Sequence, residues 1–201
     1  MRWIFRFRES SAAQWALLTA IIGIVVMAAI PAFERVMQFA DEVEFRYLAN
    51  AFEGSAKNVQ LRAALKNEIK QKDIVTVEDV SFRLNSTDDH QQGFPFALEN
   101  GAKTLTALRA EDCGALLEQF TDQSYWLDDR FQAAVEQISQ PKIRAIVVRE
   151  NGIEAQPYCR FERPVRAGIW SDDTSISARH VFAYYPASGR VEVLREIGEI
   201  K

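Results

Sequence analysis

The 201-residue sequence lacks the patterns that mark most enzymes and most nucleic-acid-binding proteins. Its 24 basic and 28 acidic side chains give a net charge of −4, so it has no basic excess with which to neutralise phosphates. It contains no Gly-x-Ser-x-Gly nucleophile motif and no glycine-rich phosphate loop. We therefore expect no enzyme, no cofactor, no nucleic-acid partner and no small-molecule substrate.

The sequence is also poor in metal ligands. Its two histidines, His90 and His180, lie far apart, and neither has a metal-ligand spacing with a cysteine. The acid pairs at 88–89 and 172–173 lack the pattern of a calcium loop, which must supply six or more oxygens. We interpret the histidines as ordinary residues and the aspartates as solvated turns, and expect no metal site.

Charge is absent from the stretch between Ser11 and Ile30, which reads SAAQWALLTAIIGIVVMAAI. About 20 apolar residues of helix cross the hydrocarbon core of a membrane. A buried helix in a soluble protein is rarely apolar on all sides for this length. A cleaved secretory signal has a shorter apolar region of about 7–15 residues. The pattern predicts an uncleaved transmembrane helix over residues 11–31.

The charges that flank this span predict its orientation. Arg2, Arg6 and Arg8 precede it, whereas residues 32–201 carry 21 basic and 27 acidic side chains, a net charge of −6. Positive charge stays on the cytoplasmic side, so we expect a single-pass inner-membrane protein with residues 1–10 in the cytoplasm and the remainder in the periplasm. The aromatic residues that alternate with the arginines suit an interfacial anchor, and a short disordered tail is an equal alternative.

Helical spacing continues beyond the expected span. Pro31 removes a backbone hydrogen bond and should kink the axis without ending the helix. Apolar residues then recur at the i, i+3, i+4 spacing of a helix with one apolar face. We expect one helix over about residues 11–70, in which residues 32–72 lead from the membrane to a head formed by residues 73–201.

The head reads as a mixture of short strands and helices. We expect short helices at 112–120, with Asp112 near its start, and at 125–139, ended by Pro141. Residues 94–96 are expected to be irregular. The expected strands are 73–77, 80–84, 143–149, 157–163, 179–185 and 190–195, the last two forming a hairpin. The order predicts an α+β fold with the long helix packed on an antiparallel sheet.

The stretch from Ala20 to Phe33, with its spacing of Gly23, Pro31 and Phe33, resembles the N-terminal helix of type IV pilins and pseudopilins. Four later segments resemble pilins of the mannose-sensitive haemagglutinin (MSHA) type, in the same order along the chain. They are Gly93-Phe94-Pro95, the stretch from Asp112 to Leu117, Tyr158-Cys159-Arg160-Phe161 and the stretch from Ala183 to Val193. The resemblance implies a pilin-like fold with a disulfide in the C-terminal region.

Two positions depart from the pilin pattern. Prepilins carry a glycine fourteen residues before the helix glycine, at the leader cleavage site, where this chain has Glu9 followed by Ser10. Pilins also carry a glutamate nine residues before that glycine, where this chain has Gln14. In pilins that carboxylate is thought to meet the freed amine of a neighbour, since a charge in lipid needs a partner. Both departures fit a pilin-like accessory protein or minor pilin that escapes the usual cleavage.

The two cysteines, Cys113 and Cys159, are compatible with one disulfide or with two buried thiols. The pilin resemblance implies the bridge, and an extracytoplasmic location permits it. In the loop-entropy treatment such a bridge contributes roughly 4 kcal/mol. Four aromatic residues fit a subunit contact surface or the core, and we favour the core; they are Tyr125, Trp126, Tyr158 and Trp170.

The resemblance implies a role in MSHA-type pilus biogenesis or as a minor pilin subunit. The implied partners are other pilin-like subunits, the inner-membrane assembly platform and membrane lipid, and the pilus is a further possible location. The small residues Ala20, Gly23, Ala28 and Ala29 would let neighbouring helices approach closely. The alternative is a membrane-tethered extracytoplasmic sensor or ligand-binding domain. Such a sensor should carry a cytoplasmic signalling region, and the ten residues before the span leave no room for one.

Overall fold

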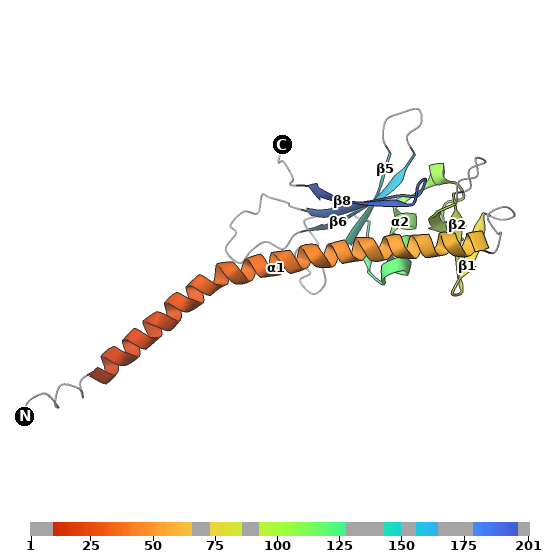
Figure 1. Ribbon diagram of the computed structural model, residues 1–201. Helices are drawn as coiled ribbons and strands as arrows, with labels where there is room; N and C mark the ends of the chain where they lie inside the picture. Colours follow the sequence, from red (N-terminus) through yellow and green to blue (C-terminus); the bar gives the residue numbers. More distant parts are fainter. Residues whose placement is uncertain are drawn as a thin grey trace, which may run out of the picture.

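The computed structural model describes residues 10–65, 73–85, 93–127, 143–149, 156–164 and 179–196. These residues form one long helix and a head of two sheets and a short helix, in the order helix, three strands, helix, five strands. Figure 1 shows the head beside the second half of the long helix, with the first half extending away from it. The α+β class is thus confirmed.

The long helix α1 runs from Ser10 to Leu65, a length of 56 residues that includes Pro31. At about 1.5 Å per residue it extends over about 84 Å. It is a helix long and apolar enough to cross a membrane, and the most apolar part is not buried by the rest of the chain. The expected continuous helix through Pro31 is confirmed as far as Leu65; residues 66–70 lie outside the described residues.

The second half of α1 buries one apolar stripe against the head. The buried residues follow each other at alternating spacings of four and three, as on one face of a helix. They are Phe45, Ala49, Phe52, Ala56, Val59 and Ala63. The small alanines let the helix backbone lie close to the head, while the two phenylalanines reach into its core.

A three-stranded antiparallel sheet covers the far end of α1. Its strands are β1 (Ile74–Val77), β2 (Val80–Leu84) and β3 (Pro95–Leu98), paired in that order. The expected irregular structure at 94–96 is wrong, because β3 begins at Pro95. This strand lies at the edge of the sheet, where the missing N–H of proline removes no ladder bond, and its Phe96 is buried in the core.

The short helix α2 (Ala110–Thr121) follows a 3₁₀ turn, η3 (Leu105–Ala107). It confirms the expected helix at 112–120 and begins two residues earlier. The Asp112 carboxylate accepts the backbone N–H of Arg109 at 2.9 Å, which satisfies a donor that the first helical turn leaves without a partner. The helix ends where Asp122 takes a left-handed backbone conformation with φ of 56°.

The larger sheet has five strands in sequence order. They are β4 (Tyr125–Trp126), β5 (Ile143–Val148), β6 (Tyr158–Pro164), β7 (Arg179–Tyr185) and β8 (Arg190–Glu196). All neighbouring pairs are antiparallel except β4 and β5, which are parallel. Four expected strands are confirmed here to within a residue or two, and the expected strands 73–77 and 80–84 are confirmed as β1 and β2. The strands form two separate sheets, where one sheet was expected.

The expected helix at 125–139 is wrong at its start. Tyr125 and Trp126 form strand β4 and pair with Ile143 and Arg144 of β5. The backbone hydrogen bonds of β5 are available to them in an extended conformation but not in a helix. Residues 128–139 lie outside the described residues. Tyr125 packs against the core, as expected for a core aromatic, while Trp170 also lies outside the described residues.

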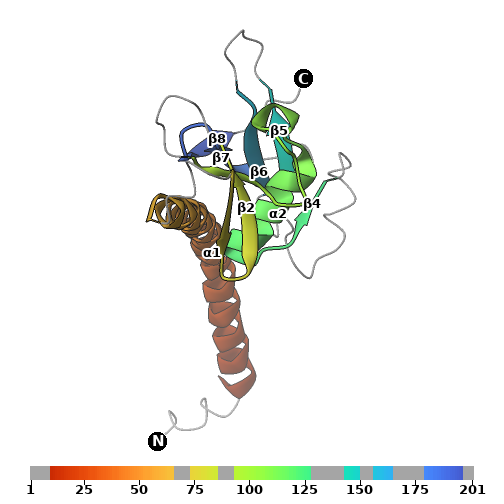
Figure 2. The same ribbon diagram turned by 90° about the vertical axis from the view of Figure 1, so that its right-hand side faces the viewer.

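An aromatic cluster joins α1 to the larger sheet. The ring of Phe52 lies 4.9 Å from Tyr184 and 5.3 Å from Phe161, measured between centroids. Phe161 in turn lies 4.7 Å from Phe182 on the next strand. These pairs stabilise the core through buried area and ring contact, which is edge-to-face between Phe52 and Tyr184. Figure 2 looks along the second half of α1 and shows the strands and α2 gathered on one side of it.

Candidate assembly surface on the long helix

The residues singled out for helix packing lie on the part of α1 that the head does not cover. Six of the seven are exposed and Gly23 is partly buried; they are Gln14, Ala20, Gly23, Ala28, Ala29, Pro31 and Phe33. Ser10 is the first residue of the helix, and Glu9 lies outside the described residues. A Cβ atom at Gly23 would meet no other atom within 4 Å, so nothing within this chain requires glycine there.

These packing candidates do not form a single face. At about 100° per residue, Ala20, Gly23 and Pro31 lie within about 80° of one another around the helix. Ala29 lies about 180° from Ala20, on the opposite side. The helix therefore presents a small-residue face of three positions, and the remaining candidates could contact only lipid or a second neighbour.

A second apolar surface continues beyond the expected span, which we call the outer stripe. Its members recur every three, four or seven residues, the spacing of a seam between paired helices. They are Val36, Ala40, Val43, Tyr47, Gly54, Leu61 and Leu65. Val43 and Phe52 are nine residues apart, about two and a half turns, so the outer stripe lies opposite the face that the head buries. All its members are exposed, and a Cβ at Gly54 would meet no atom within 4 Å.

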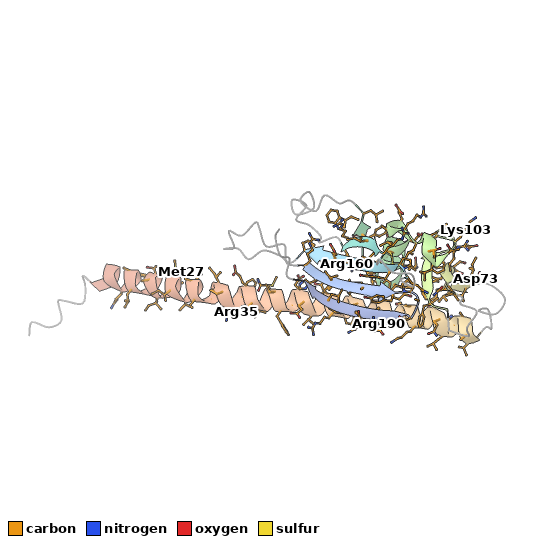
Figure 3. The ribbon with its side chains drawn as sticks, turned by 90° about the horizontal axis from the view of Figure 1, so that it is seen from above. Met27, Arg35, Asp73, Lys103, Arg160 and Arg190 are labelled. Carbon is orange, nitrogen blue, oxygen red and sulfur yellow. A yellow bond between two sulfur atoms is a disulfide. The ribbon has the colours of Figure 1, made fainter. Side chains whose placement is uncertain are left out.

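Figure 3 views the molecule from above, with side chains projecting from the helix along its free half, between Met27 and Arg35 and beyond. Hydrophobic patches of this extent on a soluble surface are uncommon and usually mark a contact with lipid or protein. In the first half of α1 lipid can cover such a surface. In the second half the head already holds the opposite face, so a covering partner has to approach from the side of the outer stripe.

A polar cluster ties α1 to the head at the end of the head nearest the free half of the helix. The buried guanidinium of Arg163 in β6 donates to the Asp41 carbonyl oxygen at 2.7 Å and to Asp41 Oδ1 at 2.9 Å. It also donates to Glu44 Oε1 at 3.1 Å and lies 5.1 Å above the ring of Phe45. His180 of β7 places Nε2 3.2 Å from Asp41 Oδ2. We call this set of five residues the neck cluster.

Sequence reasoning missed the neck cluster. His180 was interpreted as an ordinary residue, and the other four members were not singled out as a site. The partners are separated by more than a hundred residues, so no local spacing connects Asp41 with Arg163. One signal was available. Arg163 lies two residues after Phe161 on a β-prone segment, so in a strand it shares a face with an apolar residue.

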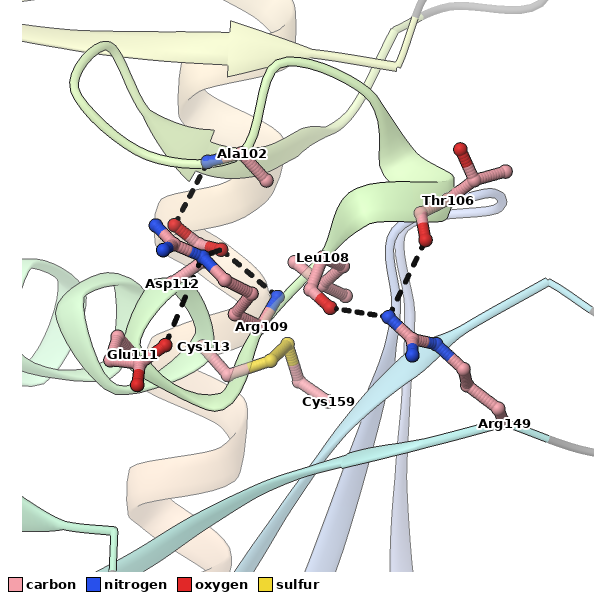
Figure 4. A network of polar contacts seen from close by, with 9 residues as sticks. All are labelled: Ala102, Thr106, Leu108, Arg109, Glu111, Asp112, Cys113, Arg149 and Cys159. Atoms are coloured by element: carbon pink, nitrogen blue, oxygen red, sulfur yellow. Dashed lines mark hydrogen bonds and ion pairs between the residues drawn. A yellow bond between two sulfur atoms is a disulfide. The ribbon is translucent and has the colours of Figure 1, made fainter.

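The disulfide between Cys113 and Cys159 is present and links α2 to β6, the central strand of the larger sheet. Figure 4 shows it beside the buried carboxylate of Asp112. That carboxylate accepts the backbone N–H of Ala102 at 3.0 Å and of Arg109 at 2.9 Å, and so fixes the segment that enters α2. The bridge and the carboxylate together hold α2 between the two sheets.

On the opposite face of β6 from the core, one buried carboxylate gathers three arginines. Glu162 Oε1 lies 2.8 Å from Arg160 Nε, and Oε2 lies 2.9 Å from Arg179 Nη1 and 3.7 Å from Arg144 Nη1. A buried charge needs such partners to offset its desolvation. The arrangement is an ion-pair network that joins β6 to β5 and β7.

Within the described residues, no group of three His, Cys, Asp or Glu side chains could hold a metal ion. His90 and the aspartate pairs at 88–89 and 172–173 lie outside those residues.

No family model, no curated protein and no solved structure matches the chain. The pilin resemblance, the orientation of the span and the compartment of the head therefore stay predictions from the sequence.

Proposed function

We propose that this protein is a membrane-anchored, pilin-like subunit that assembles with neighbouring chains through α1. The first half of the helix would lie in the inner membrane with its N-terminus in the cytoplasm, and the head would lie in the periplasm. The assembly would serve type IV pilus biogenesis of the MSHA type, as an accessory or minor pilin subunit. The head would need no catalytic activity for this role.

The observation that carries the proposal is the outer stripe. A helix that only anchored a periplasmic domain would need apolar residues over the span and polar residues after it. Here Val36, Val43 and Tyr47 remain exposed after Pro31, and the stripe extends to Leu65 at the end of the helix. Burial of each large side chain on a partner would contribute about 1.5–3 kcal/mol.

The spacing of the stripe favours another helix as the partner. Intervals of three, four and seven residues place the side chains of the stripe along a line that a second helix can follow over several turns. Ala40 and Gly54 allow close approach of a neighbouring helix along that line. A partner with a similar helix could thus contact α1 along the outer stripe, from Val36 to the end of the helix at Leu65.

Cross-linking in intact membranes tests this proposal. Val43→Cys places a thiol on the outer stripe, and Gln38→Cys places one on an exposed position about 140° around the helix. A bis-maleimide should join the Val43→Cys chain to a neighbouring pilin-like subunit carrying a thiol at the equivalent helix position, or to a second copy of the same variant. We expect this product at Val43→Cys and not at Gln38→Cys. Equal yields at both positions, or no product at any stripe position, would overturn the proposal.

A further inference from the structure

A groove of about 370 Å³ lies between β5 and the segment that leads into α2. Residues 108–110 and Leu127 line one side, and residues 144–147 with Arg149 line the other. Successive residues of a strand point to opposite faces of the sheet. Because four consecutive residues of β5 line this groove, it runs along the edge of the strand and not across one face.

The edge of β5 is only partly paired. β6 pairs with residues 144–148 on one side, whereas β4 pairs only with Ile143 and Arg144 on the other. Within the part of the chain that the structure describes, residues 145–148 have no strand beside them on the β4 side. The N–H and C=O groups along an open strand edge form a template on which an extended peptide can pair.

Charge distinguishes this edge from the rest of the protein. Three arginines line the groove, namely Arg109, Arg144 and Arg149, and none of its described lining residues is acidic. Arg144 already pairs with Glu162, and Arg109 with Asp112. The Arg149 guanidinium donates to the carbonyl oxygens of Leu108 at 2.8 Å and Thr106 at 3.4 Å, which fixes it at one end of the groove (Figure 4). Among the described residues no carboxylate forms an ion pair with Arg149, so its charge stays available to a partner.

The charge of Arg149, which no described carboxylate offsets, makes this end of the groove favour acidic partners over basic ones. Guanidinium groups pair well with carboxylates, which they bind through two parallel hydrogen bonds. Leu127, which is 39% exposed, and Ala110 supply apolar surface beside the strand edge. The combination suits an extended segment in which apolar and acidic side chains alternate.

We propose that this groove binds an extended acidic segment of a partner protein by strand addition to β5. The groove lies at the β4–β5 side of the sheet, whereas α1 contacts β7 and β8 at the other side. The two surfaces can therefore be occupied at the same time, and the groove would recruit a partner that the helix does not. The binding does not depend on assembly through the outer stripe.

Fluorescence anisotropy with the full chain in detergent tests the proposal. The probe is a short fluorescein-labelled peptide of alternating valine and glutamate. We expect it to bind, and we expect slower hydrogen exchange at residues 145–148 when it is present. A peptide with lysine in place of glutamate should bind at least about tenfold more weakly, as should a valine–glutamate peptide whose alternate backbone amides are N-methylated.

Two matched substitutions place the binding site. Leu127→Glu introduces a negative charge into the groove and should weaken binding at least about tenfold. Val193→Glu introduces the same charge at a similarly exposed position, 44% exposed, on β8 and should leave binding unchanged. The proposal fails if the acidic peptide does not bind, if the lysine or N-methylated peptide binds equally well, or if Leu127→Glu binds as tightly as Val193→Glu.

Discussion

The two halves of α1 share one helix but differ in how their apolar residues are placed. In the first half apolar side chains surround the axis, and the head buries none of the most apolar part. In the second half two separate apolar stripes alternate with charged residues, and the head covers one of them. A helix that is apolar on all sides can bury its surface in lipid alone. A helix with two apolar stripes separated by charged residues needs a protein partner on each side to bury them.

The largest expected effect comes from removing the main contact of the second half with the head. Phe52→Ala leaves a cavity between α1 and the aromatic residues of β6 and β7, and should lower the free energy of unfolding by about 3–5 kcal/mol. Urea denaturation of the detergent-solubilised protein, followed by near-ultraviolet circular dichroism, measures this loss.

The matched control for that loss is Phe39→Ala. Phe39 is 67% exposed on the same helix, so its removal should change the free energy of unfolding by less than about 0.5 kcal/mol. Equal losses for the two variants would show that the helix does not separate into a covered and an uncovered part.

A smaller effect is expected at the point where the two halves meet. Arg163→Gln leaves the carboxylate of Asp41 without its buried cation, and should lower the free energy of unfolding by about 2–3 kcal/mol. Backbone amides of α1 near Asp41 should then exchange faster with solvent, which hydrogen-exchange mass spectrometry measures.

The control for the neck cluster is an ion pair on the surface of the same helix. Arg46 pairs with Glu42 at 2.8 Å but is largely exposed, so Arg46→Gln should cost at most about 1 kcal/mol. If Arg46→Gln matched Arg163→Gln in both stability and exchange, the neck cluster would have no special part in holding the helix.

The smallest effect concerns Tyr184, which contacts Phe52 and donates its hydroxyl to the Pro95 carbonyl oxygen at 2.7 Å. Tyr184→Phe should cost about 1 kcal/mol at neutral pH through the lost hydrogen bond. Burial raises the pKa of Tyr184 well above its ordinary value of 10.0, so the folded phenol stays neutral where the unfolded one ionises. The unfolded state then binds fewer protons, and wild-type stability falls as the pH rises above about 10.

Phenylalanine does not titrate, so the cost of Tyr184→Phe should shrink by about 1.4 kcal/mol for each pH unit above 10. Denaturation at neutral and alkaline pH measures this change. A cost that stayed constant with pH would contradict the assignment of Tyr184 as a buried neutral phenol in the contact between α1 and the sheet.

The sequence allowed α1 and most strands to be predicted because each is encoded by a local period. The helix follows from apolar residues at helical spacing, and β7 and β8 follow from β-prone runs on either side of a turn at residues 186–189. The disulfide was predicted from the pilin resemblance and the expected compartment, and the structure confirms it.

The remaining features depend on contacts that no local period encodes. β3 begins at a proline because its position at a sheet edge tolerates one, and that position is set by the pairing with β2. Strand β4 forms because it pairs with residues 143–144 of β5. The neck cluster forms because β6 places Arg163 beside Asp41. The apolar spacing predicted a single apolar face on this half of the helix. The fold divides those residues into a stripe that the head buries and the outer stripe on the opposite side.

The central position of β6 determines where a mechanical load would enter the head. Near one end of this strand Arg163 is hydrogen-bonded to α1, and near its other end Cys159 is disulfide-bonded to α2. Tension applied through the anchor would therefore run lengthwise along β6 and shear it against β5 and β7, which flank it as antiparallel neighbours. A sheet resists such shear with all its ladder bonds at once, whereas a strand peeled from the edge would lose them one at a time.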